Sequence, residues 1–547
     1  MKKLFYGKPI VPGIAIAKLA IYAGKGIQQH AVRKAVGQMD VKGEHARLEA
    51  AYQKADAALS LLCQNTERNM GQEAADILGG QQAILSDPLY RAYAHDLIES
   101  ALYNAAEAAF LAGEYFAQKL AESNEARIQL RAADVQDLSQ RLVQLLEETP
   151  AKDIEEDLCF SEPVILLADA LTPSEAVRLS GGNICGVVLR QGAKESHTAI
   201  LLRSRGIPAL IETAYEADEI SGAKGILDAG RGMLLIEPDA KEEALYQAVQ
   251  RQEAAKQAAL LQLRGKESVT KDGQKLSLCA NIDGLEDLEL AVQNDAEGIG
   301  LFRTEFLYLA SDSPPTEDMQ FAIYRAAALR MKGKPVVIRA LDLGAEKQPA
   351  YLPQKPVQNP ALGLRGIRIL LREKTLFQTQ LRAIFRAALY GNLSVMYPMI
   401  AAKEELSCAR ALAAEVCREL TEEGIPFSAH VPQGIMIETP AAAVLSDELA
   451  KEADFFSIGT NDLTQYTLAA DRQDPELSSL FGTRQEAVLR LIRMTAANAK
   501  NAGIPVGICG EMGADASLCA LFLQMGIDTL SVAPPRILPL RQAIRAL

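Results

Sequence analysis

The sequence predicts a multidomain α/β protein whose C-terminal half is a (β/α)8 barrel. Its 547 residues exceed the roughly 100–200 residues of one ordinary domain. A helix-rich stretch over about residues 40–148 separates two groups of short β-type segments. After residue 266, eight short apolar segments alternate with helical ones over about 280 residues, which is the size and rhythm of a TIM barrel.

The composition is that of a folded globular protein, with 49% hydrophobic and 23% charged residues. A net charge of -13 repels nucleic acid and anionic membranes over most of the surface. The one early apolar stretch is interrupted by Pro12, Gly13 and Lys18, so it suits neither a signal peptide nor a membrane span. We therefore expect a cytoplasmic protein without nucleic-acid binding or membrane insertion.

The eight cysteines are dispersed along the chain, without a CxxC pair or a Cys/His quartet at zinc spacing. This pattern indicates neither a disulfide framework nor a zinc finger. Free cysteine is among the most buried residue types, so we expect most of these side chains to be buried.

The N-terminal half is predicted to be an α/β unit with a helical insertion. Residues 8–22 indicate one or two strands, and the strand pattern resumes over 163–238. Between them, apolar side chains at helical spacing predict a bundle of about four helices. The first strands have no β partner in that region, so we assign them to the later unit. The expected domains are 1–25 with 149–238 (α/β), 26–148 (helical), 239–265 (linker helix) and 266–547 (barrel).

The barrel strands are expected at 276–282, 298–303, 335–342, 393–400, 434–439, 454–460, 505–511 and 528–533. Polar residues at the C-terminal ends of such strands face the active site of a TIM barrel. The candidates at strand ends or in the loops that follow are Arg303, Arg339, Arg365, Glu438, Asn461, Asp462, Arg472 and Cys509.

These residue types indicate a metal-assisted phosphate site. Several arginines at one mouth would repel one another without an anion between them, and guanidinium groups suit phosphate and carboxylate. Glu438 and Asp462 could hold a hard cation such as Mg²⁺, which takes one or two protein carboxylates. Each residue alone is more typical of a surface salt bridge, but their shared position at strand ends favours the functional interpretation.

Cys509 and His197 each have a structural and a catalytic interpretation. Cys509 could be a core cysteine, but a thiol at a strand end, protonated at neutral pH, could donate a proton to an enolate carbon. His197, between Ser196 and Thr198, stands at the expected start of a helix. A lone histidine is more often structural. However, a helix N-terminus stabilises phosphate, and histidine forms covalent intermediates.

The motifs resemble the phosphoenolpyruvate-protein phosphotransferases, the Enzyme I family of the bacterial sugar phosphotransferase system. They run nearly end to end and include PGIAIAK, RAADVQDLSQRL, SHTAILLRS, AEGIGLFRTEFLYL, NPALGLRGIR, DFFSIGTNDLTQYTLAADR and GICGEM. The resemblance implies a swivelling phosphohistidine domain, an inserted helical domain that docks the carrier HPr, and a dimerising barrel that binds phosphoenolpyruvate (PEP). It implies the first step of sugar uptake, in which HPr receives the phosphoryl group at a histidine.

The resemblance also implies roles for the candidate residues. Arg303, Arg339, Arg472 and the Asn461/Asp462 pair would bind PEP, and we add Arg365 to this set. Glu438 and Asp462 would bind Mg²⁺. His197 would accept the phosphoryl group, and Cys509 would protonate enolpyruvate to pyruvate.

The sequence departs from the family pattern at three places. Residues 192–198 read GAKESHT instead of Gly-Gly-Arg-Thr-Ser-His-Thr, and the Glu195 carboxylate should oppose phosphate while raising imidazole basicity. Gln81 stands where relatives often carry His in the carrier-docking helices. The sequence ends at Leu547, where the family usually continues, so we expect a short last helix and a weaker dimer.

Two alternatives stay open at this stage. A pyruvate phosphate dikinase or PEP synthase would share the histidine and barrel domains but needs an ATP-grasp domain, for which the sequence has no suitable Gly-rich loop. A regulatory protein could retain the fold and sense PEP without turnover. Pyruvate release and acid-labile phosphate distinguish an enzyme from such a sensor.

Overall fold

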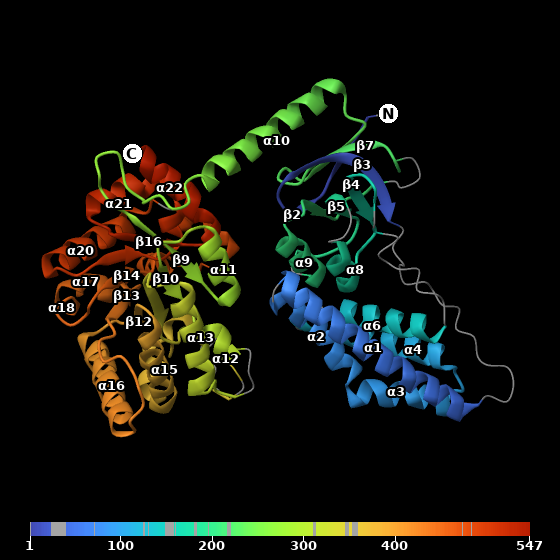
Figure 1. The fold of residues 1–547 in the computed structure, drawn as a ribbon, viewed down its shortest axis with the longest axis horizontal. Helices are drawn as coiled ribbons and strands as arrows, with labels where there is room; N and C mark the ends of the chain where they lie inside the picture. Colours follow the sequence, from blue (N-terminus) through green and yellow to red (C-terminus); the bar gives the residue numbers. More distant parts are fainter. Residues whose placement is uncertain are drawn as a thin grey trace. The chain divides into compact units, whose positions relative to one another are not determined.

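The computed structural model confirms the predicted fold class, with two compact units at residues 1–255 and 256–547 (Figure 1). The structure describes residues 2–22, 40–70, 72–123, 126–129, 131–147, 158, 160–179, 183–194, 196–215, 220–309, 313–344, 349, 351–352, 359–472, 474–482 and 484–547. Within these residues, no helix is both long and apolar enough to cross a bilayer.

The first unit contains an eight-stranded sheet in the order β1-β8-β7-β3-β4-β5-β6-β2. Its strands are β1 (Lys3–Tyr6), β2 (Lys8–Val11), β3 (Ile14–Tyr22), β4 (Val164–Ala168), β5 (Ile184–Leu189), β6 (Ala209–Ile211), β7 (Lys224–Asp228) and β8 (Met233–Ile236). Strand β3 pairs with β4 in parallel and with β7 antiparallel, so the N-terminal strands join those of the later segment. This pairing places residues on both sides of the helical region in one sheet.

The helical region has five helices of twelve or more residues among its described residues, one more than the sequence predicts. They are α1 (Val41–Met70), α2 (Gln72–Leu85), α3 (Pro88–Glu99), α4 (Ala105–Ala121) and α6 (Ala132–Leu146), with the single turn α5 (Ala126–Gln129). The extra helix arises at Asp87, whose side chain accepts the Leu89 N–H at 2.7 Å, with Pro88 at the first helical position. Proline starts a helix readily but cannot continue one, so α2 and α3 separate here.

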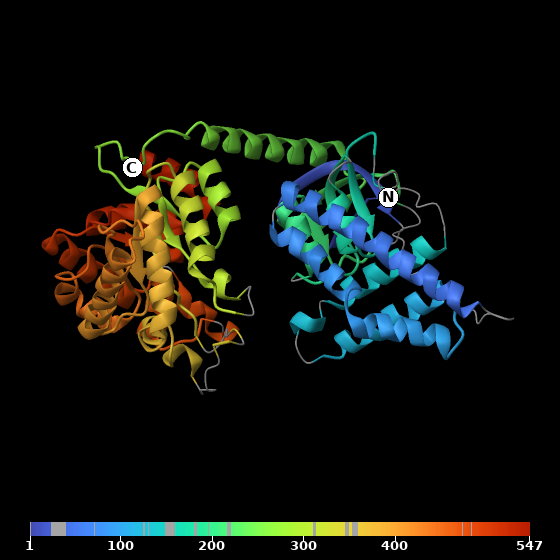
Figure 2. The same cartoon turned by 60° about the horizontal axis from the view of Figure 1, so that its bottom comes forward.

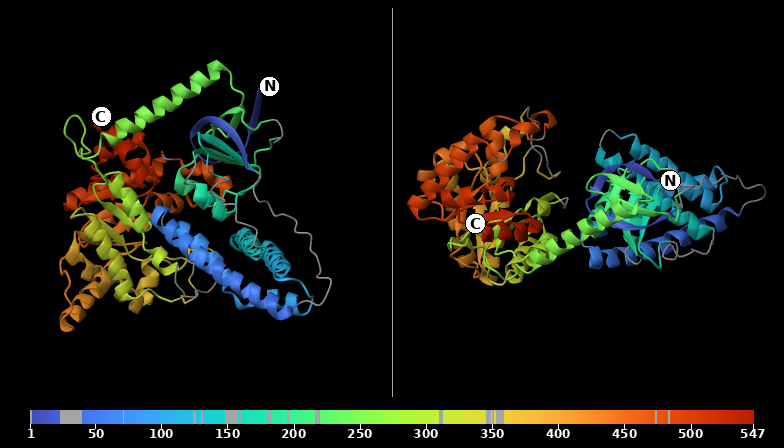
Figure 3. Two further views of the ribbon diagram at one scale, coloured as in Figure 1. Left: turned by 45° about the vertical axis from the view of Figure 1, so that its right-hand side comes forward. Right: turned by 90° about the horizontal axis from the view of Figure 1, so that it is seen from above.

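Two short helices lie between the sheet and the bundle, as Figures 1 and 2 show. They are α8 (Pro173–Arg178) and α9 (His197–Arg205). A small apolar cluster joins α2 to both of them through Leu78, Val177 and Leu201. Helix α10 (Ala240–Leu261) follows β8 and leads into the second unit (Figure 3).

The second unit is a closed barrel of eight parallel strands. These are β9 (Ser277–Ile282), β10 (Ile299–Phe302), β11 (Val336–Arg339), β12 (Leu393–Tyr397), β13 (Gln433–Ile437), β14 (Phe456–Ile458), β15 (Val506–Ile508) and β16 (Thr529–Val532). Helices that include α11 (Leu285–Gln293), α13 (Glu317–Arg330), α15 (Lys374–Ala387), α16 (Lys403–Glu422), α20 (Glu486–Ala502), α21 (Cys519–Met525) and α22 (Ile537–Ala546) surround the strands (Figure 3). The main apolar core lies between strands and helices.

A buried arginine fixes the last helix to the beginning of the barrel. Arg541 in α22 has 0% exposure. Its guanidinium group donates to the Asp295 carboxylate at 2.5 Å, to the Asp295 carbonyl at 2.7 Å and to the Ser268 hydroxyl at 3.2 Å. The side chain therefore connects α22 to the residues that flank β9 and β10.

We expect Arg541→Ala to lower the free energy of unfolding by about 3–5 kcal/mol, because the change removes a fully buried side chain together with its hydrogen bonds to Asp295 and Ser268. Arg545→Ala is the matched control in the same helix, since Arg545 makes one exposed hydrogen bond to the Glu267 carbonyl. Its loss should cost at most about 1 kcal/mol. Urea unfolding monitored by circular dichroism measures both values, and equal losses would contradict a special role for Arg541.

Candidate active site

The eight candidate residues of the barrel line one cavity of about 540 Å³ at the C-terminal ends of the strands. Arg303 follows β10, Arg339 ends β11, Glu438 follows β13 and Cys509 follows β15. The other four lie in the loops or helices that follow strands, namely Arg365, Asn461, Asp462 and Arg472. Closure of a parallel barrel brings these ends together, so residues distant in sequence face the same space.

Two arginines at this mouth are buried against carboxylates. Arg339 lies 3.1 Å from Glu305 and 3.4 Å from Asp342, and Arg365 lies 3.0 Å from the same Asp342 oxygen. Burial alone would lower the pKa of Arg339, but the surrounding carboxylates raise it above its ordinary value. Burial likewise opposes ionisation of Asp342, yet the two guanidinium groups hold its pKa below the usual range. All three side chains therefore carry full charge at neutral pH.

Two further arginines lie nearer the solvent. The Arg303 guanidinium donates to both oxygens of Asp283 at 2.9 and 3.0 Å. Arg472 is 42% exposed at its side chain and lies 3.8 Å from Asp462. Because exposed arginines exchange partners at little cost, both can turn toward an anion in the cavity.

Glu438 and Asp462 carry the polar atoms best suited to a cation. Glu438 is fully buried, and one of its oxygens accepts the Met399 N–H at 2.6 Å. Its Oε2 and the Asp462 Oδ1 are buried without a hydrogen-bond partner, although Arg365 and Arg472 lie 4.0 and 3.8 Å from Asp462. Burial, with the nearby charges of Asp342 and Asp462, raises the pKa of Glu438 to about 8. A bound divalent cation would satisfy both orphaned oxygens.

Within the described ranges, no group of three or more His, Cys, Asp or Glu side chains is arranged to hold a metal ion. A cation held by two carboxylates must complete its coordination with water and with ligand oxygens. The donor set therefore fits a hard cation that binds together with an anionic ligand.

Cys509 lies at the floor of the cavity and is 4% exposed. Its Sγ is 3.5 Å from the Ile458 carbonyl, which accepts the thiol proton. Burial raises the pKa of the thiol to about 11. The Asn281 amide donates to the Cys509 carbonyl at 3.0 Å and fixes the backbone there. The thiol thus keeps its proton at neutral pH and faces the ligand space.

Four further polar residues of this site were not predicted from the sequence. They are Asn281, Asp283, Glu305 and Asp342, which neutralise the arginines or position Cys509. The sequence did contain a signal for these residues, because all four lie at or just after the ends of expected barrel strands. Asp342 was included in the expected strand 335–342, but β11 ends at Arg339.

His197 stands at the N-terminus of α9 in the first unit, as the sequence predicts. The Ser196 hydroxyl accepts the Ala199 N–H at 3.2 Å, which caps the helix. The imidazole Nδ1 lies 2.9–3.0 Å from the two carboxylate oxygens of Asp134, a residue of α6 that is 2% exposed. A carboxylate only accepts, so Nδ1 carries a proton, and in the neutral ring the Nε2 lone pair is then available.

Gln81, the second departure from the family pattern, lies in the interior of the helical region. Its side chain is fully buried and donates to Asp137 at 2.8 Å, and Asp137 also accepts the Ser174 N–H at 3.1 Å. Gln81 therefore bonds α2 to α6 within the bundle, and Asp137 connects the bundle to α8. The other departure, Glu195, lies outside the described residues.

Three models of PEP-utilising enzymes match the chain: the N-terminal domain at residues 6–131, the mobile domain at 160–232 and the PEP-binding domain at 257–547. Relatives named phosphoenolpyruvate-protein phosphotransferase match along nearly the whole length. The relative from Priestia megaterium is 36% identical, and the match covers 100% of this chain and 94% of the relative. The relative from Geobacillus stearothermophilus is 38% identical, and the match covers 100% of this chain and 93% of the relative. The relative from Bacillus subtilis is 37% identical, and the match covers 93% of this chain and 89% of the relative. The chain therefore belongs to the PEP-utilising enzymes, within the phosphoenolpyruvate-protein phosphotransferases.

Proposed function

We propose that this chain transfers the phosphoryl group of PEP to Nε2 of His197 and then to a histidine of an HPr-type carrier, with release of pyruvate. This is the first step of the sugar phosphotransferase system. The observation that carries the proposal is the gathering of four arginines, the Glu438 and Asp462 carboxylates and a neutral thiol around one cavity. A doubly anionic substrate that becomes an enolate needs these three kinds of group.

Substrate binding would use the charges at the barrel mouth. Arg339 and Arg365 are held in place by Asp342, so they offer a preorganised cationic surface to the phosphate and carboxylate groups. Arg303, Asn461 and Arg472 add donors at the rim. Glu438 and Asp462 would hold Mg²⁺, which when bound offsets charge on the substrate oxygens and satisfies the two orphaned carboxylate oxygens.

Phosphoryl transfer would use the tautomer of His197 that carries its proton on Nδ1 and leaves Nε2 free to act as the nucleophile. The Nε2 lone pair attacks phosphorus, the bond from phosphorus to the enol oxygen breaks, and Asp134 stabilises the charge that develops on the ring. The enolate carbon then takes the proton of the Cys509 thiol, which yields pyruvate. The phosphohistidine passes its phosphoryl group to HPr, which we place on the helical region.

We expect Asp134→Asn to slow phosphorylation of His197 by about 10²- to 10⁴-fold, because the amide can donate to Nδ1 and so place the ring proton on Nε2. Rapid-quench measurement of acid-labile phosphate gives the rate. PEP binding to the barrel should stay unchanged. Asp96→Asn, on the exposed face of α3, is the control and should behave as the unaltered protein.

The whole proposal is tested by mixing the protein with Mg²⁺ and phosphate-labelled PEP. An enzyme releases one pyruvate per chain in the first turnover and carries acid-labile label at His197, which HPr then removes. A sensor of PEP binds the compound but forms neither product, and that result would refute the proposal. Homodimer formation through the barrel, a cytoplasmic location and the domain limits stay predictions, and light scattering with and without PEP measures the first.

A further inference from the structure

Two of the four histidines that the structure describes face each other in the helical region. His45 lies in α1 and His95 in α3, and their rings stack with the centroids 4.7 Å apart and the planes 22° from parallel. The Nδ1 atoms of the two rings are in direct contact. The two side chains are 22% and 26% exposed, so solvent reaches this histidine pair.

A glutamate of the opposite helix faces the far nitrogen of each ring. Residues 45–49 read HARLE and residues 95–99 read HDLIE, so each helix carries His and Glu four positions apart on one face. The Nε2 atom of His95 lies 2.9 Å from Glu49 Oε1, and that of His45 lies 3.3 Å from Glu99 Oε1. Each histidine therefore faces the glutamate of the other helix, which gives the same arrangement twice.

Neighbouring side chains hold one of these carboxylates in place. The Arg91 guanidinium lies 3.7 Å from Glu49 and stacks over the ring of Tyr52, 4.5 Å from its centroid. Tyr52 is fully buried, and its ring stands edge-on to that of His95 with the centroids 6.5 Å apart. The orientation of Glu49 toward His95 is thus supported by the core of the helical region.

Two neutral imidazoles cannot satisfy all of these contacts, because each neutral ring carries one N–H and one lone pair. If both rings direct their N–H at the glutamates, two Nδ1 lone pairs face each other. If one ring instead donates its Nδ1–H to the other, its own Nε2 lone pair faces a carboxylate. In the described part of the chain, His45 Nε2 is buried without a hydrogen bond, although Glu99 is near. A cation between the two Nδ1 atoms, either a proton or a metal ion, removes the conflict.

We propose that His45 and His95 bind Zn²⁺ through their Nδ1 atoms. Imidazole nitrogen suits zinc, and a histidine that ligates a metal usually donates its other N–H to a carboxylate, as Glu49 and Glu99 are placed to accept. The two rings move apart to admit the ion, which their position at the surface of the bundle allows.

Water completes the coordination of the ion. Among the described residues, no third His, Cys, Asp or Glu side chain joins the pair in a metal-binding group, so the remaining positions of the tetrahedron are open to solvent. The site differs from the cation site proposed at Glu438 and Asp462, whose oxygen ligands suit Mg²⁺. It lies in the first unit and does not depend on the proposed function.

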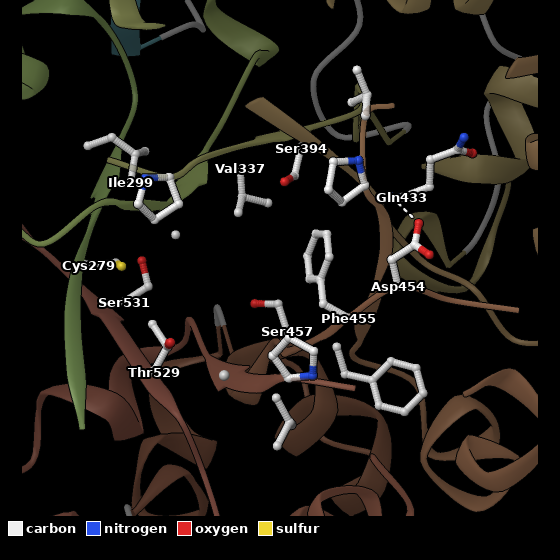
Figure 4. Close-up of a pocket in the computed structure, with 18 of the residues that line it drawn as sticks. Cys279, Ile299, Val337, Ser394, Gln433, Asp454, Phe455, Ser457, Thr529 and Ser531 are labelled. Carbon is white, nitrogen blue, oxygen red and sulfur yellow. Dashed lines mark hydrogen bonds between the residues drawn. The ribbon is translucent and has the colours of Figure 1, made fainter. Parts of the chain in front are cut away.

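His430 provides the comparison within the same chain. It is exposed and lines a cavity of about 730 Å³ at the N-terminal end of the barrel, whose interior Figure 4 shows. The hydroxyl groups of Ser394, Ser457 and Thr529 share that cavity with it. A single imidazole supplies one zinc ligand instead of two, so His430 is the control for the histidine pair.

Zinc binding is measured on the full-length protein by equilibrium dialysis against Zn²⁺ in excess Mg²⁺, which competes for carboxylates but not for imidazole nitrogen. We expect His45→Ala and His95→Ala each to lose one bound Zn²⁺ per chain, whereas His430→Ala retains it. The zinc X-ray absorption that His95→Ala loses should show imidazole nitrogen at about 2.0–2.1 Å.

A carboxylate variant separates this site from a chance neighbourhood of two surface histidines. Glu49→Gln keeps both rings but removes the charge that orients His95, and it should weaken Zn²⁺ binding by about 10- to 100-fold. Glu122→Gln is the matched control in the same region, because Glu122 is exposed and pairs only with Lys119 among its printed ion pairs, far from either histidine in sequence. It should leave the affinity unchanged.

The opposite results would overturn the proposal. Equal zinc binding by the unaltered protein and both histidine variants would show that the pair holds only a proton. Equal affinity in Glu49→Gln and the unaltered protein would show that the carboxylates do not support a metal site. Loss of the same zinc ion from His430→Ala would place the bound ion elsewhere in the chain.

Discussion

His197→Ala is expected to abolish phosphoryl transfer, with acid-labile phosphate falling below detection and no phosphate reaching HPr. The reason is that the imidazole Nε2 is the atom to which the new bond forms, so no neighbouring group can replace it. Asp134, which faces Nδ1, is an acceptor and carries no comparable nucleophile for a stable intermediate. Phosphate label from PEP, followed by peptide mapping, gives the measurement.

The control for this variant is His430→Ala, which removes an exposed imidazole from the barrel unit. It should retain the label at His197. The His197→Ala variant should also keep its affinity for PEP, because the arginines of the catalytic cavity belong to the other unit. Label on a different histidine, or loss of PEP binding, would contradict the assigned role.

Glu438→Gln is expected to lower activity strongly and to stabilise the metal-free protein at alkaline pH. Burial and neighbouring carboxylates raise the pKa of Glu438 to about 8, above its value in the unfolded chain. Between about pH 4.5 and 8 the folded protein holds a proton that the unfolded chain releases, so rising pH favours unfolding. Glutamine is uncharged and removes this pH dependence, while it leaves Asp462 as the remaining carboxylate for a cation.

Two measurements check the Glu438 prediction. Urea unfolding in chelator, at pH 5 and pH 8, should show that stability falls with pH in the unaltered protein and falls less in Glu438→Gln. Pyruvate formation with Mg²⁺ should drop by about 10²- to 10³-fold, in line with the loss of one electrostatic group from an active site. Glu448→Gln, on the surface, should change neither result. Equal pH dependence in Glu438→Gln would show that another group controls stability.

The barrel could be predicted from the sequence because its strands leave a local signal. The expected strand at 393–400, for example, is buried along its whole length in the structure, and helices follow most strands. Closure of the barrel then gathers the strand ends, so a list of polar residues at those ends predicted the lining of the catalytic cavity. Each step needed only residues close in sequence and a known architecture.

Features that depend on tertiary contact could not be predicted. The Asp134 partner of His197 lies 63 residues away in another helix, and no local pattern indicates that the two meet. The burial of Gln81 and the Asp342 bridge between Arg339 and Arg365 have the same origin. Burial of most cysteines was also expected, yet of the seven that the structure describes, three are buried, three are partly buried and Cys408 is exposed.

The pairing of β9 with β16 has a consequence for folding kinetics. It joins Ser277 to Thr529, and Arg541 then ties the following helix to residues 268–297. The contacts that close the barrel thus join residues with the greatest sequence separation in the unit. Such contacts slow folding, because the chain loses the conformational entropy of loop closure before the stabilising contacts form. During synthesis, the barrel can close only after its final strand has left the ribosome, whereas the first unit is by then available to fold. We expect the barrel unit to be the slower folding unit of the chain.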